Sequence, residues 1–174
     1  MSLIVPLPDG ISRNHLAAAG GPPAGTAAIF ILGMLLTAAL AGWLGGARSE
    51  RYARSSAQAD IVVSMPQIMR SGMFFETRIE VIAREPLNDA TIAMSPALWR
   101  SITINTQIPE PSEQEFKSGF YQFHYGPLKA GERIAVKFDA QINPDLFLGN
   151  KGEIALLDGE RLVARLPLTL TVLP

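Results

Sequence analysis

The residues that could carry out chemistry are few in this 174-residue chain. It contains two histidines, His15 and His124, and no cysteine. The absence of cysteine excludes disulfides, zinc thiolates, iron–sulfur clusters and a thiol nucleophile. A blue-copper site, which needs two histidines and one cysteine, is excluded as well. The two histidines also lie on opposite sides of a long apolar run, so we expect them not to act as a pair.

Three methionines are the remaining candidates for metal binding. Met65, Met69 and Met73 recur every four residues, and thioether sulfur is a suitable ligand for Cu(I). Methionine is also a common filler of irregular gaps in hydrophobic cores. Core packing is the favoured interpretation, and no cofactor is predicted.

No combination of residues indicates an enzyme. His124 lies in an apparent strand without the Gly-x-Ser-x-Gly motif that places a serine nucleophile near a base. The carboxylates Glu110, Glu113 and Glu115 fall in one acidic, proline-containing stretch, where charged groups are usually solvated. Asp145 and Asn150 lack the regular oxygen spacing of a calcium loop. With a net charge of −1, the chain also has no basic surface of the kind that binds nucleic acid.

An uncharged apolar run near the N-terminus predicts one transmembrane helix over residues 26–46. From Thr26 to Leu44 no side chain is charged. With its neutral flanks, a helix rising about 1.5 Å per residue would cover the ~30 Å hydrocarbon layer of a bilayer. Residues 1–25, which are rich in proline and glycine, are predicted to be an irregular tail.

Small residues within this run suggest a helix-packing face, because they let another helix approach closely. They form two rows with a spacing of four residues. The first row is Gly33, Thr37 and Ala41, and the second is Ala38, Gly42 and Gly46. The predicted partners are therefore the lipid bilayer and either another membrane protein or a second copy of the chain.

The orientation of the predicted anchor has conflicting signals. Arg48, Arg51 and Arg54 follow the apolar run and favour a cytoplasmic C-terminal part under the positive-inside rule. The β-rich character of that part favours the other side. We expect a single-pass protein of the cell membrane whose C-terminal domain is extracytoplasmic, that is, periplasmic in a bacterium.

Beyond a predicted tether at 47–58, alternation of apolar and polar residues predicts a β domain over 59–174. Ile134, Val136 and Phe138 alternate with polar or small residues, as in a half-buried strand. Asp158-Gly159 is typical of a tight hairpin, and Pro167 indicates an edge strand or a bulge. The stretch 107–118 is expected to be an exposed loop. About seven short strands without a convincing helix predict a two-sheet antiparallel sandwich.

The turn and strand at 126–138, Gly-Pro-Leu-Lys-Ala-Gly-Glu-Arg-Ile-Ala-Val-Lys-Phe, resemble those of bacterial immunoglobulin-like and fibronectin-type-III-like modules. The resemblance implies an immunoglobulin-like or fibronectin-III-like sandwich and leaves the activity open. The disulfide pair of true immunoglobulin domains is missing, and Trp99 is a candidate core tryptophan.

Aromatic and apolar residues near expected loop ends are the candidate interaction surface, because such side chains bury a large area at low entropic cost. They can equally belong to the core. The candidates are Trp99, Phe116, Phe120, Tyr121, Phe147 and Leu148.

The sequence therefore favours a non-enzymatic, membrane-anchored interaction module, an accessory subunit of a larger membrane protein complex. The alternative is a membrane-anchored protein that binds or delivers a small ligand or Cu(I) through the methionine row.

Overall fold

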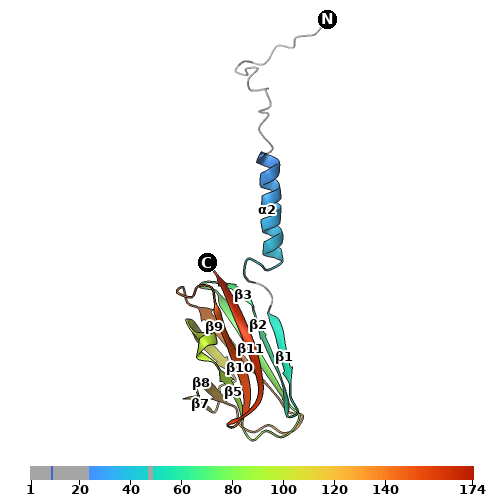
Figure 1. The fold of residues 1–174 in the computed structure, drawn as a ribbon, viewed down its shortest axis with the longest axis vertical. Coiled ribbons are helices and arrows are strands. Elements are labelled where there is room, and N and C mark those ends of the chain that lie inside the picture. The colour runs from blue at the N-terminus through green and yellow to red at the C-terminus, as the bar shows by residue number, and fades with distance from the viewer. Residues whose placement is uncertain (1–8, 10–23, 47–48) are drawn as a thin grey trace. The chain divides into compact units, whose positions relative to one another are not determined.

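The computed structural model describes residue 9 and residues 24–46 and 49–174. Contacts divide the chain into two compact units, residues 1–40 and residues 41–174. Residues 24 and 25, which were predicted to end an irregular tail at 1–25, belong to a helix instead. The rest of that tail, except residue 9, and the residues His15 and Arg48 lie outside the described residues. The second unit holds all the strands (Figure 1).

The described part of the first unit is one helix, α2, at Ala24–Leu40. It has 17 residues, equivalent to about 25 Å of rise. The helix ends where the chain turns at Ala41 and Gly42. Gly42 has a φ of 80°, which is unfavourable for residues other than glycine. Among the described residues, no helix has the length and apolar character needed to cross a membrane. The prediction of a single-pass transmembrane helix over 26–46 is therefore wrong.

The end of α2 also changes the predicted helix-packing rows. Gly33, Thr37 and Ala38 lie within the helix, where the Thr37 hydroxyl donates a hydrogen bond to the Gly33 carbonyl oxygen over 2.8 Å. Ala41, Gly42 and Gly46 follow it, and Gly46 has a φ of 77°. The two rows therefore do not continue along one helical face.

The second unit consists of two facing sheets (Figure 1). One sheet has the order β1-β2-β4-β9-β6, and the other has the order β3-β11-β10-β5-β8-β7. The strands are β1 Glu50–Ser55, β2 Ala59–Met65, β3 Ile68–Arg70, β4 Phe74–Ala83, β5 Ala90–Met94, β6 Ile102–Ile108, β7 Glu113–Lys117, β8 Phe120–His124, β9 Arg133–Ile142, β10 Asn150–Asp158 and β11 Arg161–Leu173. A short helix, α3 at Pro96–Trp99, links β5 to β6.

The apolar faces of both sheets form one core. In β4 every second residue from Phe75 to Ala83 is buried, as the alternation in the sequence predicts. Phe138 of β9 is fully buried and contacts the rings of Trp99 and Phe123, with centroid distances of 6.0 and 5.5 Å. Trp99 is 8% exposed, so its prediction as a core tryptophan is confirmed.

The structure corrects two predictions, the number of strands and their purely antiparallel pairing. The described residues form eleven strands where about seven were predicted. β1 lies in the predicted tether, β7 lies in the predicted exposed loop, and β3 pairs with β11 in parallel. These three strands occupy sheet edges, where one side of the strand has no pairing partner in the described sheets.

Two local predictions agree with the structure. Asp158 pairs with Arg161 across a two-residue turn, Gly159 and Glu160, so the hairpin is confirmed with its turn shifted by one residue. Pro167 pairs with β10 but precedes the residues of β11 that pair with β3. On the β3 side β11 has no partner at Pro167, so the missing N–H removes no ladder hydrogen bond there.

Candidate interaction groove

A groove of about 430 Å³ opens where edge strand β6 of one sheet faces strands β8 and β7 of the other. We call it the β6–β8 groove. None of its lining residues is charged. They are Met94, Trp99, Ile102, Ile104, Gln107, Gln114, Tyr121 and Phe123.

A bulge in β6 determines which side chains enter the groove. Ile104 is opposite Ala140 of β9, whereas Thr106 is opposite Asp139, so Asn105 is the extra residue. Because an extra residue shifts the two-residue alternation by one, Gln107 lines the groove and Ile108 does not. Ile108 is left 54% exposed.

Aromatic rings form the floor and rim of the groove. Trp99 on the floor stacks on Phe75 with a centroid distance of 6.3 Å and an interplanar angle of 16°. On the rim, Tyr121 is 45% exposed and contacts the ring of Phe116, which is 61% exposed, with centroids 5.2 Å apart. The rim therefore presents adjacent aromatic surfaces to solvent.

Two polar features lie beside these rings. The Gln107 side-chain amide donates a hydrogen bond to the Tyr125 hydroxyl oxygen over 2.6 Å, and burial raises the pKa of Tyr125 to about 12. Tyr125 is therefore neutral at physiological pH and holds Gln107 in place. The indole nitrogen of Trp99 is buried without a hydrogen-bond partner among the described residues, which is an unfavourable state for an N–H donor.

The structure separates the six predicted interaction residues. Trp99 and Tyr121 line the β6–β8 groove, and Phe116 packs beside it. Phe120 lies in a different hollow, on the outer face of the second sheet. Phe147 and Leu148 are exposed in the loop between β9 and β10. Gln107 and Gln114 were missed, because the stretch containing them was predicted to be a loop.

The methionines take the positions expected of core residues. Met65 and Met69 are each 2% exposed and belong to the hydrophobic core, and Met73 packs partly buried against it. Among the described residues, no group of three or more His, Cys, Asp or Glu side chains is arranged to hold a metal ion.

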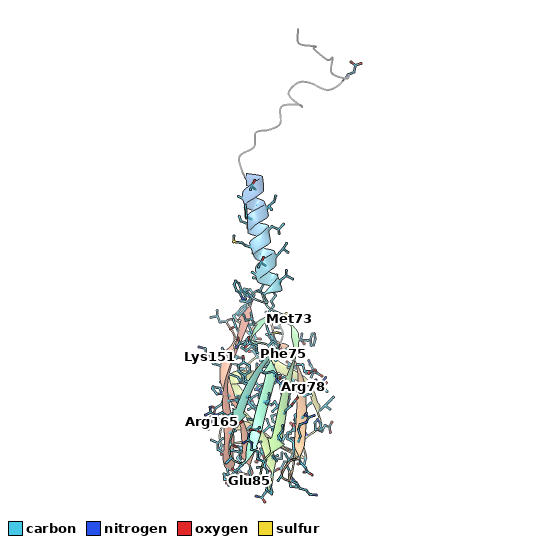
Figure 2. All side chains as sticks on the ribbon, turned by 90° about the vertical axis from the view of Figure 1, so that its right-hand side faces the viewer. Met73, Phe75, Arg78, Glu85, Lys151 and Arg165 are labelled. Atoms are coloured by element: carbon cyan, nitrogen blue, oxygen red, sulfur yellow. The ribbon has the colours of Figure 1, made fainter. Side chains whose placement is uncertain are left out.

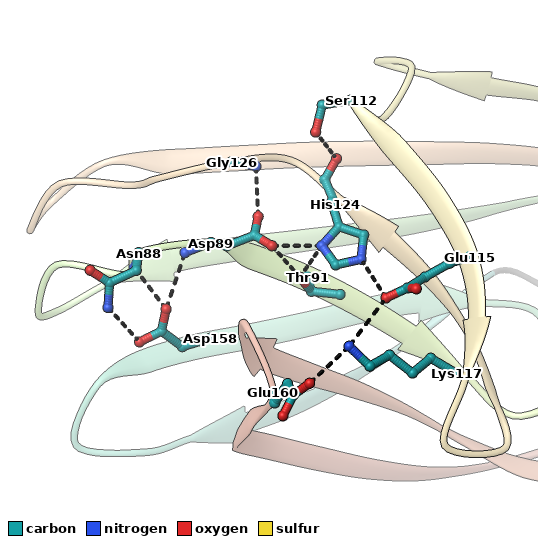
Figure 3. Close-up of polar contacts among 10 residues, drawn as sticks. All are labelled: Asn88, Asp89, Thr91, Ser112, Glu115, Lys117, His124, Gly126, Asp158 and Glu160. Atoms are coloured by element: carbon teal, nitrogen blue, oxygen red, sulfur yellow. Dashed lines mark hydrogen bonds and ion pairs between the residues drawn. The ribbon is translucent and has the colours of Figure 1, made fainter.

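His124 joins β8 to its neighbours through two carboxylates (Figure 3). Its Nδ1 lies 2.6 Å from Asp89 Oδ2 and 3.0 Å from the Thr91 hydroxyl. Its Nε2 lies 3.4 Å from Glu115 Oε1, within ion-pair range but without hydrogen-bond geometry. Lys117 contacts the same carboxylate at 3.8 Å and Glu160 at 2.8 Å. The Thr91 hydroxyl also donates a hydrogen bond to Asp89 Oδ2 over 3.1 Å, and Thr91 is fully buried, so this hydroxyl is not open to a substrate.

The His124 cluster predicts a pH dependence of stability. Burial alone would lower the pKa of His124, but the hydrogen bond and charge of Asp89, together with Glu115, raise it above its usual value of 6.5. A raised folded-state pKa stabilises the fold fully below the pKa of the unfolded chain, and this contribution is lost as pH rises through the folded value. Urea unfolding across this range should therefore give a stability that declines as His124 deprotonates. The His124→Gln variant should show a flatter profile, and an equally steep decline in that variant would contradict the assignment.

Comparisons with known proteins give no family. No family model matches the chain, and no curated protein matches it. Among solved structures, the chain is similar to the chitin-binding domain of a hyperthermophilic chitinase from Pyrococcus furiosus, at 12% identity and a TM-score of 0.40, covering 64% of this chain and 98% of that one. It is also similar to a GH20 exo-β-N-acetylglucosaminidase from Vibrio harveyi, at 14% identity and a TM-score of 0.26, covering 73% of this chain and 18% of that one. Likenesses this weak carry no argument about function.

Proposed function

We propose that this protein is a non-enzymatic interaction module, an accessory subunit of a larger protein assembly, that binds an extended apolar segment of a partner protein in the β6–β8 groove. The observation that carries the proposal is an uncharged groove with exposed aromatic rings on its rim, open along an edge strand. This proposal does not depend on a membrane-spanning anchor.

The chemistry of the groove favours an apolar occupant. Exposed aromatic and branched aliphatic side chains gain free energy when a partner covers them. Tyr121, Phe116 and Ile104 offer such surface at 45%, 61% and 39% exposure. The groove has no charged lining residue, so a charged side chain inserted there would lose its hydration without gaining an ion pair.

The edge strand favours an extended occupant. β6 pairs with β9 and has no strand on its other side in the described sheet. An extended peptide can add to such an edge through main-chain hydrogen bonds while alternate side chains enter a neighbouring pocket. β6 contains no charged residue, whereas the edge strands β1 and β7 contain several. Charges on an edge strand discourage such pairing.

Charges beside the groove favour basic residues at the ends of the occupant. Glu110 follows β6, and Glu113 begins β7 next to the groove residue Gln114. Both glutamates are exposed. Carboxylates at an interface rim attract basic partners and mainly speed their association.

Copper delivery receives no support from the positions of the methionines. Met65 and Met69 are 2% exposed within the core, so binding a copper ion there would require the core to open. A small apolar ligand in the β6–β8 groove remains the second candidate, because the groove volume of about 430 Å³ falls within the common range for small-molecule sites.

Peptide binding tests the proposal. The probe is a synthetic peptide of alternating valine and threonine with lysines at both ends, and a peptide with the same composition in shuffled order is the reference. We expect the alternating peptide to bind more tightly and to shift the NMR signals of β6 and β8. Ile104→Asp should weaken its binding by about tenfold or more.

Leu162→Asp is the matched control, because Leu162 is a comparably exposed apolar residue, at 48%, outside the groove. It should leave the affinity unchanged, and both variants should keep the urea midpoint of the parent protein. Equal binding of the two peptides, or equal loss in the two variants, would contradict the proposal.

A further inference from the structure

His124 connects the edge strand β7 to the turn that precedes β5 (Figure 3). Its Nδ1 lies 2.6 Å from Asp89 Oδ2, and its Nε2 lies 3.4 Å from Glu115 Oε1. Asp89 belongs to the turn between β4 and β5, at the end of the sandwich where Figure 2 labels Glu85, opposite to Met73. Glu115 is the middle residue of β7. The ring of one histidine therefore lies between carboxylates of two separate elements.

The contact between His124 and Glu115 depends on the charge of the ring. A carboxylate accepts hydrogen bonds and does not donate them, so Asp89 keeps a proton on Nδ1 when the ring is neutral. Nε2 is then an acceptor near a second carboxylate, and it is buried without a hydrogen-bond partner among the described residues. Such an unsatisfied buried atom is costly. Protonation places an N–H on Nε2, and the contact with Glu115 becomes attractive.

The charged groups around His124 favour the protonated ring. They are Asp89 from the β4–β5 turn, Glu113, Glu115 and Lys117 from β7, and Asp158, Glu160 and Arg161 from the β10–β11 hairpin. β5 contributes no charged side chain. Carboxylates outnumber cations in this set, and Lys117 is itself paired with Glu160 at 2.8 Å. Burial alone would lower the pKa of His124, but Asp89 and Glu115 raise it.

β7 has few other contacts that hold it in place. It is a five-residue edge strand that pairs with β8 alone, and all but one of its residues are exposed. Segments with few buried contacts open more readily than the central strands of a sheet. The attraction between His124 and Glu115 is therefore one of the few side-chain contacts that fix the position of β7.

The two faces of β7 link this contact to the β6–β8 groove. Side chains alternate between the faces of a strand, so Glu115 lies on the face of His124 while Gln114 and Phe116 lie on the other. Gln114 lines the groove, and Phe116 contacts the ring of Tyr121 on its rim. A movement of β7 therefore moves one wall of the groove.

We propose that protonation of His124 holds β7 in place and thereby controls the affinity of the β6–β8 groove for its occupant. The wall formed by β7 is fixed while the ring is protonated and loosens when the ring loses its proton. An extended segment therefore binds more tightly at acidic pH than at basic pH. The identity of the occupant rests on the proposed function, but the position of β7 can be measured without any occupant.

Amide hydrogen exchange in the free full-length chain tests the control of β7. β1 is the internal reference, because it is also an edge strand with mostly exposed residues and it lies in the other sheet. The pH is raised from about 5.5 to about 8.5, a range in which ordinary carboxylates and lysines keep their charge. We expect the protection of β7 relative to β1 to fall by about fivefold or more.

The affinity of the alternating valine–threonine peptide, with both termini blocked, should fall by a similar factor over the same range. Glu115→Gln should remove both pH dependences. Its amide can donate to Nε2 of the neutral ring and its oxygen can accept from the protonated ring, so β7 stays held in both states. His15→Gln is the matched control, because it removes the other histidine of the chain, and it should keep both pH dependences.

These measurements separate the inference from the proposed function. A protection ratio of β7 to β1 that stays constant with pH would overturn the inference, as would an unchanged pH dependence in Glu115→Gln. A ratio that changes while the peptide affinity stays constant would overturn the link to the groove. Absence of peptide binding at every pH, together with a changing ratio, would contradict the proposed function and support the control of β7 by His124.

Discussion

Replacing Phe138 with alanine is expected to lower the free energy of unfolding by about 3–5 kcal/mol. Phe138 is fully buried in β9 and contacts aromatic rings from β8 and from α3, at Phe123 and Trp99. Its removal therefore leaves a cavity between the sheets, and the two rings, which are held by separate elements, cannot collapse freely into it. Urea unfolding followed by circular dichroism measures the loss as a lower midpoint with an unchanged slope.

Phe74→Ala is the matched control, because it removes the same ring from a site that is 68% exposed. Its effect on the free energy of unfolding should stay within about 0.5 kcal/mol. A loss for Phe138→Ala as small as that for Phe74→Ala would contradict the position assigned to Phe138 in the core.

Replacing Gly149 with alanine is expected to destabilise the protein by at least about 3 kcal/mol. Gly149 has a φ of 98°, and a Cβ there would overlap the backbone of Leu170 in β11. The clash is with main chain rather than with a flexible side chain, so relief requires β10 and β11 to separate beside Asn150. Thermal and urea unfolding of the variant measure the effect.

Gly72→Ala separates the cost of the positive φ from the cost of the clash with Leu170. Gly72 also has a positive φ, 80°, but a Cβ there would meet nothing within 4 Å. We expect this variant to lose only about 1 kcal/mol, the cost of the left-handed conformation. Equal losses for Gly72→Ala and Gly149→Ala would mean that β11 does not approach Gly149 as closely as described.

Strands that bury one face could be predicted from the sequence. In β4, β9 and β11 the apolar residues alternate over ten residues or more, and this period is specific to half-buried strands. Edge strands carry no such signal. Five of the six residues of β1 are exposed, and all but one residue of β7 are exposed, so their sequences resemble polar linkers and loops.

The membrane-spanning prediction failed because composition does not show where a helix ends. The apolar run continues from Leu40 to Leu44, but α2 stops at Leu40 and Gly42 adopts a positive φ. A glycine in an apolar run is tolerated within helices and also favours their ends. The sequence alone did not distinguish these two roles.

The candidate groove was only partly predictable. Trp99 and Tyr121 were identified by their residue type, but their places on the floor and rim of one groove depend on how α3 and the paired strands β8 and β5 are arranged in the fold. Gln107 faces the groove because of the bulge at Asn105, and no residue pattern around Asn105 indicated a bulge. The contact between His124 and Asp89 joins residues 35 positions apart and depends on the same sheet.

Partner binding in the β6–β8 groove can be tested by site-specific photo-crosslinking in cells that naturally make the protein. A photoreactive amino acid replaces Ile104 in the groove or, in the control, Leu162 outside it. We expect one discrete adduct from position 104 and none from position 162, and mass spectrometry should map the adduct to an extended segment with alternating apolar residues and basic ends. Equal adducts from both positions, or an adduct from position 104 that maps to a charged or helical surface, would contradict binding of an extended apolar segment in the groove.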